Sequence, residues 1–153
     1  MTETPALGDP RLDQIEHEIV RHGPVSSPDE AAAARGVTPA QVIKTMVVRR
    51  AADDYIFVLV PGDRSISWPK LRSHLSVNRI SMPDADEARS VTGYERGTIT
   101  PFGSTRAWPV LADQALSDIV SIGGGAPGVS LTIAAEDIIQ TLNATVADVT
   151  EPV

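Results

Sequence analysis

One stretch decides which kind of fold this chain can adopt: Thr45-Met46-Val47-Val48-Arg49-Arg50-Ala51-Ala52-Asp53-Asp54-Tyr55-Ile56-Phe57-Val58-Leu59-Val60. Its two ends are rich in β-branched and aromatic side chains, which favour extended strands. The short connection between them, residues 51–54, suits two antiparallel strands joined by a tight turn. We therefore predict a β-hairpin at the centre of the fold, with Pro61-Gly62-Asp63 closing its second strand.

Helices and strands are expected on both sides of this hairpin. Apolar spacing, Pro at first turns and Gly at ends predict helices; they cover residues 12–22, 27–36, 38–44, 67–74, 84–90 and 135–142. Short runs rich in Val and Ile predict further strands over residues 109–112, 118–122 and 129–133. Strands with helices inserted between them indicate an α+β or mixed α/β fold. Because no repeat or linker interrupts the chain, we expect one domain over residues 11–153, preceded by a flexible tail, residues 1–10.

The composition is that of an ordinary globular domain without cysteine. The 153 residues are 42% hydrophobic and 22% charged, close to the average for globular proteins. The absence of Cys excludes disulfides, a thiolate nucleophile and zinc sites with sulfur ligands. No apolar run approaches the roughly 20 residues that cross a bilayer, and the acidic, Pro-rich start is unlike a secretory signal. We therefore expect a cytoplasmic protein.

The net charge of −7 is distributed unevenly along the chain. Residues 44–106 hold ten Lys or Arg and seven Asp or Glu, whereas the flanking segments hold three basic and thirteen acidic residues. A locally basic surface on an acidic protein suits brief, salt-sensitive contact with a polyanion, and disfavours non-specific coating of nucleic acid. A solvated face that uses Arg where the flanks use Glu explains the counts equally well.

Lys44 is the first candidate for a functional residue. It lies between a predicted short helix and an apolar strand, with Val42, Ile43, Met46 and Val47 around it. Such surroundings lower the pKa of an ammonium group or require carbonyl or anionic partners for it, and either state can bind or polarise a charged ligand. The alternative is a lysine in the last turn of a helix, where the helix dipole favours a cation.

The glycine-rich turn Gly123-Gly124-Gly125-Ala126-Pro127-Gly128 is the second candidate. It contains the spacing G-x-G-x-x-G, but a dinucleotide-binding fingerprint must open a helix, and here a strand-like run over residues 129–133 follows. We therefore reject a dinucleotide-binding oxidoreductase, and the lack of Gly-Lys-Ser/Thr excludes a P-loop. The exposed N–H groups of the turn can face a carbonyl or anionic oxygen. The alternative is a plain connecting loop.

The third candidate is the segment over residues 92–103, TGYERGTITPFG. Three glycines and one proline fix an irregular path that lets a ligand approach the backbone closely, and alone this indicates only a structured loop. Other catalytic motifs are missing: there is no G-x-S-x-G and no H-E-x-x-H. The three histidines, His17, His22 and His74, lack metal-ligand spacing. We therefore expect no metal site and no cofactor.

These features, in this order, resemble the YbaK/EbsC family, which includes the editing domain inserted in bacterial prolyl-tRNA synthetases. The resemblance extends over about residues 12–150. The matching pieces are Gln41-Val42-Ile43-Lys44-Thr45-Met46-Val47-Val48, Val60-Pro61-Gly62-Asp63, Thr92-Gly93-Tyr94 through Gly97 to Thr100-Pro101-Phe102-Gly103, Gly124-Gly125 with Gly128, and the C-terminal Ala134-Ala135-Glu136-Asp137-Ile138 and Val146-Ala147-Asp148-Val149.

The resemblance implies a barrel-like mixed β-sheet surrounded by helices. It also implies hydrolysis of the ester that joins a wrong amino acid to the 3′ adenosine of a tRNA, typically alanine or cysteine on proline tRNA, with prolyl-tRNA synthetase as a candidate protein partner. Carried over residue by residue, Lys44 is the family's essential lysine. The residues expected to shape the substrate site are Gly93, Gly97, Thr100, Pro101, Phe102 and Gly103 in the loop and Gly123, Gly124 and Gly125 in the glycine turn.

The sequence departs from the cysteine-directed members of this family at one place. These members tend to carry a Ser-Gly-Gly turn followed by an acidic residue, where this chain has Gly123-Gly124-Gly125 and Ser130. Cysteine specificity is therefore not carried over. The alternative is a binding or regulatory module, which keeps the fold and holds the ligand without hydrolysing it. Lys44 and the intact glycine turn favour the enzyme.

Overall fold

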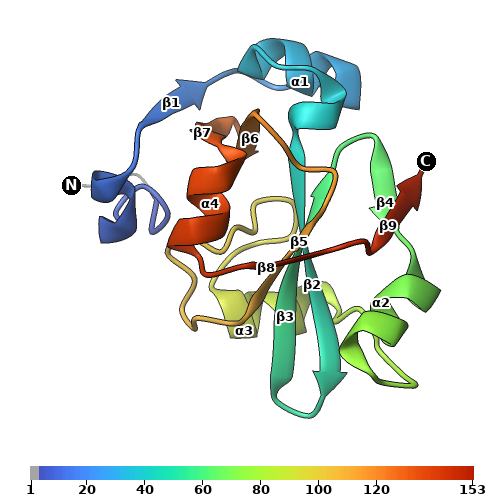
Figure 1. The fold of residues 1–153 in the computed structure, drawn as a ribbon. Coiled ribbons are helices and arrows are strands. Elements are labelled where there is room, and N and C mark those ends of the chain that lie inside the picture. Colours follow the sequence, from blue (N-terminus) through green and yellow to red (C-terminus); the bar gives the residue numbers. More distant parts are fainter. Residues whose placement is uncertain (1–3) are drawn as a thin grey trace.

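The computed structural model describes residues 4–153, and its central element is the predicted hairpin (Figure 1). Strand β2 (Ile43–Ala51) pairs antiparallel with β3 (Asp54–Pro61), from Ile43 opposite Pro61 to Arg49 opposite Tyr55. Two parallel neighbours extend the sheet beyond β3, namely β5 (Val110–Asp113) and β8 (Thr145–Ala147), in the order β2-β3-β5-β8. One edge of β2 is therefore left outside this sheet.

Two smaller sheets complete the β structure. Strands β1 (His17–Arg21), β7 (Val129–Ala134) and β6 (Ile119–Gly123) form an antiparallel sheet in that order, and β4 (Arg64–Ile66) pairs with β9 (Thr150–Pro152). The mixed α+β class is confirmed. The described strands form three sheets that do not close into a barrel, because β2 meets β6 through a single bridge, Val42 to Ser121.

Within residues 4–153, four α-helices and two short 3-10 helices surround these sheets. They are η1 (Pro10–Gln14), α1 (Pro28–Arg35), η2 (Pro39–Gln41), α2 (Trp68–Leu75), α3 (Ala85–Thr92) and α4 (Ala135–Thr141). The expected caps are present at α1, where the Ser27 hydroxyl accepts from the Glu30 N–H and Gly36 ends the helix in the left-handed conformation. No helix among residues 4–153 is long and apolar enough to cross a membrane.

The central sheet separates two clusters of buried side chains. Phe57 and Leu59 of β3 face one cluster, which includes Ile138 of α4. Val58 lies on the opposite face with Leu71 of α2. Accordingly, α4 and α2 lie on opposite sides of the central strands (Figure 1). Burial on both faces explains why β3 reads as an uninterrupted apolar run rather than an alternating one.

Two predicted helices are wrong. Residues 12–22 form the 3-10 helix η1 and then strand β1, because pairing of β1 with β7 supplies backbone hydrogen bonds that outweigh the helical spacing of Leu12, Ile15 and Ile19. Residues 38–44 form only the short turn η2, and the β-branched Ile43 already pairs with Pro61. Lys44 therefore lies within β2 and not at the end of a helix.

The start of the described chain packs against the two glycine-containing segments. The Thr4 hydroxyl donates a hydrogen bond of 2.6 Å to the Gly124 carbonyl, and Ala6 is fully buried. The Asp9 carboxylate accepts a 2.9 Å hydrogen bond from the Gly103 N–H. These contacts lie within the segment expected as a tail, residues 1–10, of which the first three lie outside the described residues.

Gly103→Ala should destabilise the fold because an added methyl group has no space. Gly103 has a φ of 68°, and a Cβ atom there would lie 2.3 Å from the carbonyl carbon of Pro5. Left-handed strain of about 1–2 kcal/mol and overpacking of about 1–3 kcal/mol predict a combined loss of about 2–5 kcal/mol in the free energy of unfolding. Urea unfolding followed by circular dichroism measures this loss.

Gly23→Ala is the matched control, because a Cβ atom at Gly23 would meet nothing within 4 Å. We expect it to change the free energy of unfolding by less than about 1 kcal/mol. Equal losses in the two variants would contradict the close packing of Gly103 against the N-terminal segment.

Candidate active site

A pocket of about 510 Å³ lies along the open edge of β2. Its walls come from β2 itself, from the segment that leads into α3, from the loop after α3 and from the end of β6. Most of the lining side chains are apolar, with three cations among them. The lining residues are Arg35, Val42, Ile43, Lys44, Thr45, Met46, Val47, Met82, Pro83, Asp84, Ala85, Ala88, Arg96, Gly97, Ile99 and Gly123.

The edge of β2 is held by single bridges at its two ends and is open between them. Val42 bridges Ser121 at one end. At the other end Arg49 and Ser81 exchange two backbone hydrogen bonds of 2.8 and 3.0 Å. Because the N–H and C=O of successive strand residues point to opposite sides, those of Val47 and Thr45 point outward as those of Arg49 do. The pocket is therefore bordered by unpaired backbone groups.

Lys44 lines this pocket, and its ammonium group is turned towards β4. Nζ donates a hydrogen bond to the backbone carbonyl of Arg64. Burial lowers the pKa of Lys44 below its ordinary value, and the nearby Asp63 carboxylate opposes this shift. A carbonyl partner and partial desolvation are the environment that the sequence predicts for this lysine, although it lies within a strand.

The glycines of the predicted site occupy different surroundings. Gly97 and Gly123 both line the pocket, and a Cβ atom at either would meet nothing closer than 3.8 Å. Gly124 and Gly125 do not line it: Cβ atoms there would lie within 3 Å of Val129 and Tyr94, respectively. The structure thus brings Lys44, Gly97 and Gly123 to one pocket and places the rest of the turn against the protein interior.

The backbone of Gly123 is directed towards β2. The Gly124 N–H donates to the Val129 carbonyl of β7 over 2.8 Å. By alternation the N–H and C=O of Gly123 point away from β7, on the same side as Ser121, which bridges Val42 of β2. A bare backbone N–H on this wall is the kind of group that stabilises a developing oxyanion.

The remaining residues predicted in the loop over residues 92–103 are packed inside the protein. Thr100, Pro101 and Phe102 are buried, and none of them lines the pocket. The Tyr94 hydroxyl donates to the Phe102 carbonyl over 2.6 Å, and burial raises the pKa of Tyr94 to about 12. Gly93 lies beside the Thr105 side chain. These residues fix the path of the loop that carries Gly97.

Arg35 and Arg96 are pocket residues that the sequence did not single out. Arg35, in the last turn of α1, reaches Ser121 with a long 3.4 Å contact from its guanidinium to Oγ, and burial lowers its pKa. Its Nε is buried and has no hydrogen-bond partner among the described residues. No spacing in the sequence marks these arginines, because only the fold brings α1 and the loop after α3 to the edge of β2.

A second cavity, of about 460 Å³, is rich in arginine. Its lining includes Arg49, Arg50, Arg72 and Arg79. Arg49 and Arg50 form ion pairs with Glu87 and Asp54, whereas Arg72 and Arg79 form none within residues 4–153. The two cavities flank the bridge between Arg49 and Ser81, so a basic surface continues from the edge pocket. This pattern suits a ligand that carries several phosphates.

Fold and pocket together define an α+β domain with a partly apolar, basic pocket at an open strand edge. Residues 22–141 match the family model of the aminoacyl-tRNA editing domain. The chain therefore belongs to the aminoacyl-tRNA editing domain family, and its resemblance to YbaK/EbsC is confirmed. Domains of this family act as deacylases that edit aminoacyl-tRNA.

Similar proteins include both synthetases and free-standing domains. The proline–tRNA ligase of Bacillus licheniformis is 31% identical over 102 residues, which cover 67% of this chain but 18% of the ligase. EbsC of Enterococcus faecalis, named as a candidate Cys-tRNA(Pro)/Cys-tRNA(Cys) deacylase, is 24% identical over 126 residues, 81% of this chain and 77% of EbsC. The solved structure of a candidate trans-editing enzyme for prolyl-tRNA synthetase shares the fold, with a TM-score of 0.82 at 23% identity over 88% and 87% of the two chains.

Asp9→Asn should weaken the anchoring of the loop that carries Gly97. Burial alone raises the pKa of Asp9, but the Arg11 guanidinium and the N–H groups of Arg11 and Gly103 more than offset it, so the pKa lies below its ordinary value. A group with a lowered folded-state pKa stabilises the fold above its unfolded pKa of about 3.9, and this contribution is lost as the pH falls through the folded value.

At pH 7 the variant should lose about 1.5–3 kcal/mol in the free energy of unfolding, as expected for hydrogen bonds to a charged group. Urea unfolding at pH 7, 5 and 3 should give similar losses at the first two values and a smaller loss at pH 3. Asp13→Asn, which changes an exposed carboxylate on η1, serves as control. If the loss in the free energy of unfolding is as large at pH 3 as at pH 7, the charge of Asp9 does not contribute to stability.

Proposed function

We propose that this chain is a trans-editing aminoacyl-tRNA deacylase that hydrolyses the ester of mischarged tRNA, with Ala- or Cys-tRNA(Pro) as substrate. The observation that carries the proposal is that Lys44, Gly97 and Gly123 line one pocket at the edge of β2. Each of them lies in a different motif of the editing family. The names of EbsC and of the trans-editing structure support the same substrate class.

The proposed reaction asks little acid–base chemistry of the protein. A water molecule attacks the ester carbonyl carbon, the bond to the ribose oxygen breaks, and that oxygen takes a proton. The products are the free amino acid and a tRNA with an intact 3′ end. Because the ester is already activated, a positioned water and stabilisation of the developing oxyanion are sufficient. The Gly123 N–H is directed suitably for the second task.

Lys44 supplies positive charge beside the same pocket. Its ammonium group is held by a carbonyl and not by a carboxylate, so its charge is not neutralised by a direct ion pair. A cation placed in this way attracts the phosphate or ribose of the terminal adenosine and positions the ester. The apolar side chains around it suit the adenine base and the side chain of a small amino acid.

Lys44→Ala should lower the rate of deacylation by about 10²–10³-fold, the cost of removing one preorganised electrostatic group. The measurement uses purified protein with Ala-, Cys- and Pro-tRNA(Pro), and follows loss of the labelled amino acid. Pro-tRNA(Pro) should remain charged.

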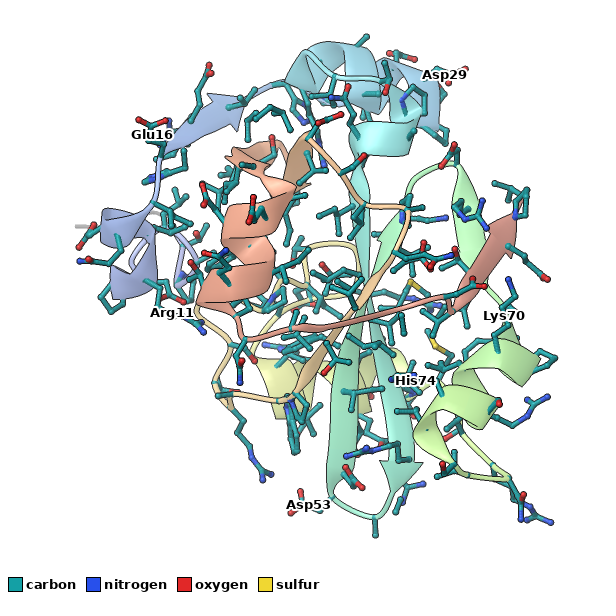
Figure 2. The ribbon with its side chains drawn as sticks, in the orientation of Figure 1. Arg11, Glu16, Asp29, Asp53, Lys70 and His74 are labelled. Carbon is teal, nitrogen blue, oxygen red and sulfur yellow. The ribbon has the colours of Figure 1, made fainter. Side chains whose placement is uncertain are left out.

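Lys70→Ala is the matched control. Lys70 is exposed on α2, where it pairs with Asp148 over 3.0 Å, and Figure 2 shows it at the outer surface. Undiminished turnover by Lys44→Ala would overturn the assignment of Lys44. Protection of the ester by the wild-type protein would instead indicate a binding module.

Arg79→Ala should weaken tRNA binding through the arginine-rich cavity. Arg79 has no ion-pair partner among the described residues, so its charge is available to a phosphate. The plot of log affinity for uncharged tRNA against log salt concentration should become less steep by about 1. Arg89→Ala, which removes an arginine already paired with Glu95 over 3.3 Å, should leave the slope unchanged. Equal slopes for wild type and Arg79→Ala would exclude this cavity from the tRNA contact.

A further inference from the structure

Thr45 lines the edge pocket and carries three polar groups without a hydrogen-bond partner within residues 4–153. It lies midway between the two bridges that hold β2, at Val42 and Arg49. The N–H and C=O of Arg49 point away from β3, towards Ser81, and those of every second residue along β2 point the same way, which includes Thr45. No described residue is seen to hydrogen-bond to these two groups of Thr45. Its Oγ1 is buried and also lacks a partner within residues 4–153. Buried polar atoms without partners are rare in folded proteins, which points to a ligand that completes them.

The small number of acceptors in the pocket restricts where a cationic ligand group can bind. Three lining residues, Arg35, Lys44 and Arg96, are cations. Among the described lining residues, only Thr45 and Asp84 carry a side-chain oxygen. One oxygen of Asp84 already accepts the Glu87 N–H at the start of α3. A positively charged group that enters the pocket therefore has few acceptors: the second Asp84 oxygen, the outward carbonyls of Thr45 and Val47, and the Thr45 hydroxyl. Of these, Thr45 alone offers two acceptors in one residue without a described partner for either.

An aminoacyl ester brings both kinds of group in one extended unit. Its α-ammonium is a donor, its carbonyl is an acceptor, and in an extended conformation the two point to the same side, as in one residue of a strand. An open strand edge recognises an extended chain in this way, with main-chain hydrogen bonds on one side.

We propose that the edge of β2 at Thr45 binds the α-ammonium group of the aminoacyl ester, through the main-chain carbonyl and the side-chain hydroxyl of Thr45. This inference rests on the proposed function and adds to it the part of the substrate that the site recognises, its α-ammonium group. The site thereby distinguishes an amino acid from a hydroxy acid or an N-blocked amino acid. The amino-acid side chain is left to the apolar walls, which include Ile99 and Ala88.

The test measures affinity and does not depend on turnover. The probes are 3′-alanylamido-3′-deoxyadenosine and its lactyl counterpart, in which a hydroxyl replaces the α-ammonium and which no hydrolysis consumes. Isothermal titration calorimetry at pH 6.5 keeps the amine of the first probe protonated. We expect wild type to bind the alanyl probe at least 10-fold more tightly than the lactyl probe, because hydrogen bonds to charged groups are the strong ones.

Thr45→Val keeps the shape of the side chain and removes its hydroxyl. We expect it to reduce the preference for the alanyl probe by about 5–10-fold and to leave lactyl affinity within about 2-fold, while Thr45→Ser keeps the preference. Asp84→Asn retains a cap for α3 and removes the other candidate acceptor; it should keep the preference as well. Unchanged urea unfolding of Thr45→Val would show that its fold is intact.

Three results would overturn the inference: equal binding of the two probes by wild type, full preference in Thr45→Val, or loss of the preference in Asp84→Asn alone. Hydrolysis of Ala-tRNA(Pro) is measured in parallel. A protein that prefers the alanyl probe but clears no ester would refute the deacylase proposal and uphold the Thr45 site. A protein that hydrolyses the ester but binds the two probes equally would uphold the deacylase proposal and refute the Thr45 site.

Discussion

The structure depends on a strand that is paired on one side only. An open strand edge is usually a liability, because its free N–H and C=O groups pair with other chains. Here β2 is closed at both ends, by Ser121 of β6 and by Ser81 before α3, and is open only across the pocket. The polar backbone left there lies among apolar side chains such as Val47 and Met82. This edge is therefore protected from another strand and remains available to a small ligand.

The positive charge of the pocket arises because the fold brings several basic side chains together there. The chain carries a net charge of −7, yet the edge pocket and the neighbouring cavity together contain seven basic residues. Arg35 and Lys44 are partly desolvated, which strengthens their interaction with an anion that enters. The segments that flank residues 44–106 are acidic, which disfavours broad contact with a polyanion outside these two cavities.

The sequence predicts the hairpin and the later helices well, because each depends on local signals. Apolar runs mark β2 and β3, and the caps at Ser27 and Gly36 mark α1. It fails for β1, because that strand exists only through its pairing with β7, about 110 residues away in the chain. Arg35 and the edge of Thr45 were missed for the same reason. Neither is marked by a local pattern of residues. Whether a strand has an open edge depends on which other strands pair with it, and that is decided by distant parts of the chain.

The glycines divide into two structural roles that the motifs alone do not separate. Gly97 and Gly123 leave open space in the pocket. The space beside Gly103 is filled by Pro5 and Ala6, and the space beside Gly125 by Tyr94 together with Thr4 and Ala6. The N-terminal segment thus holds both pocket walls, since Thr4 bonds the turn after Gly123 and Asp9 bonds the loop that carries Gly97. A side chain at Gly103 would clash with this segment, and one at Gly125 would clash first with Tyr94. These glycines therefore act on the site through packing, although they lie outside the pocket.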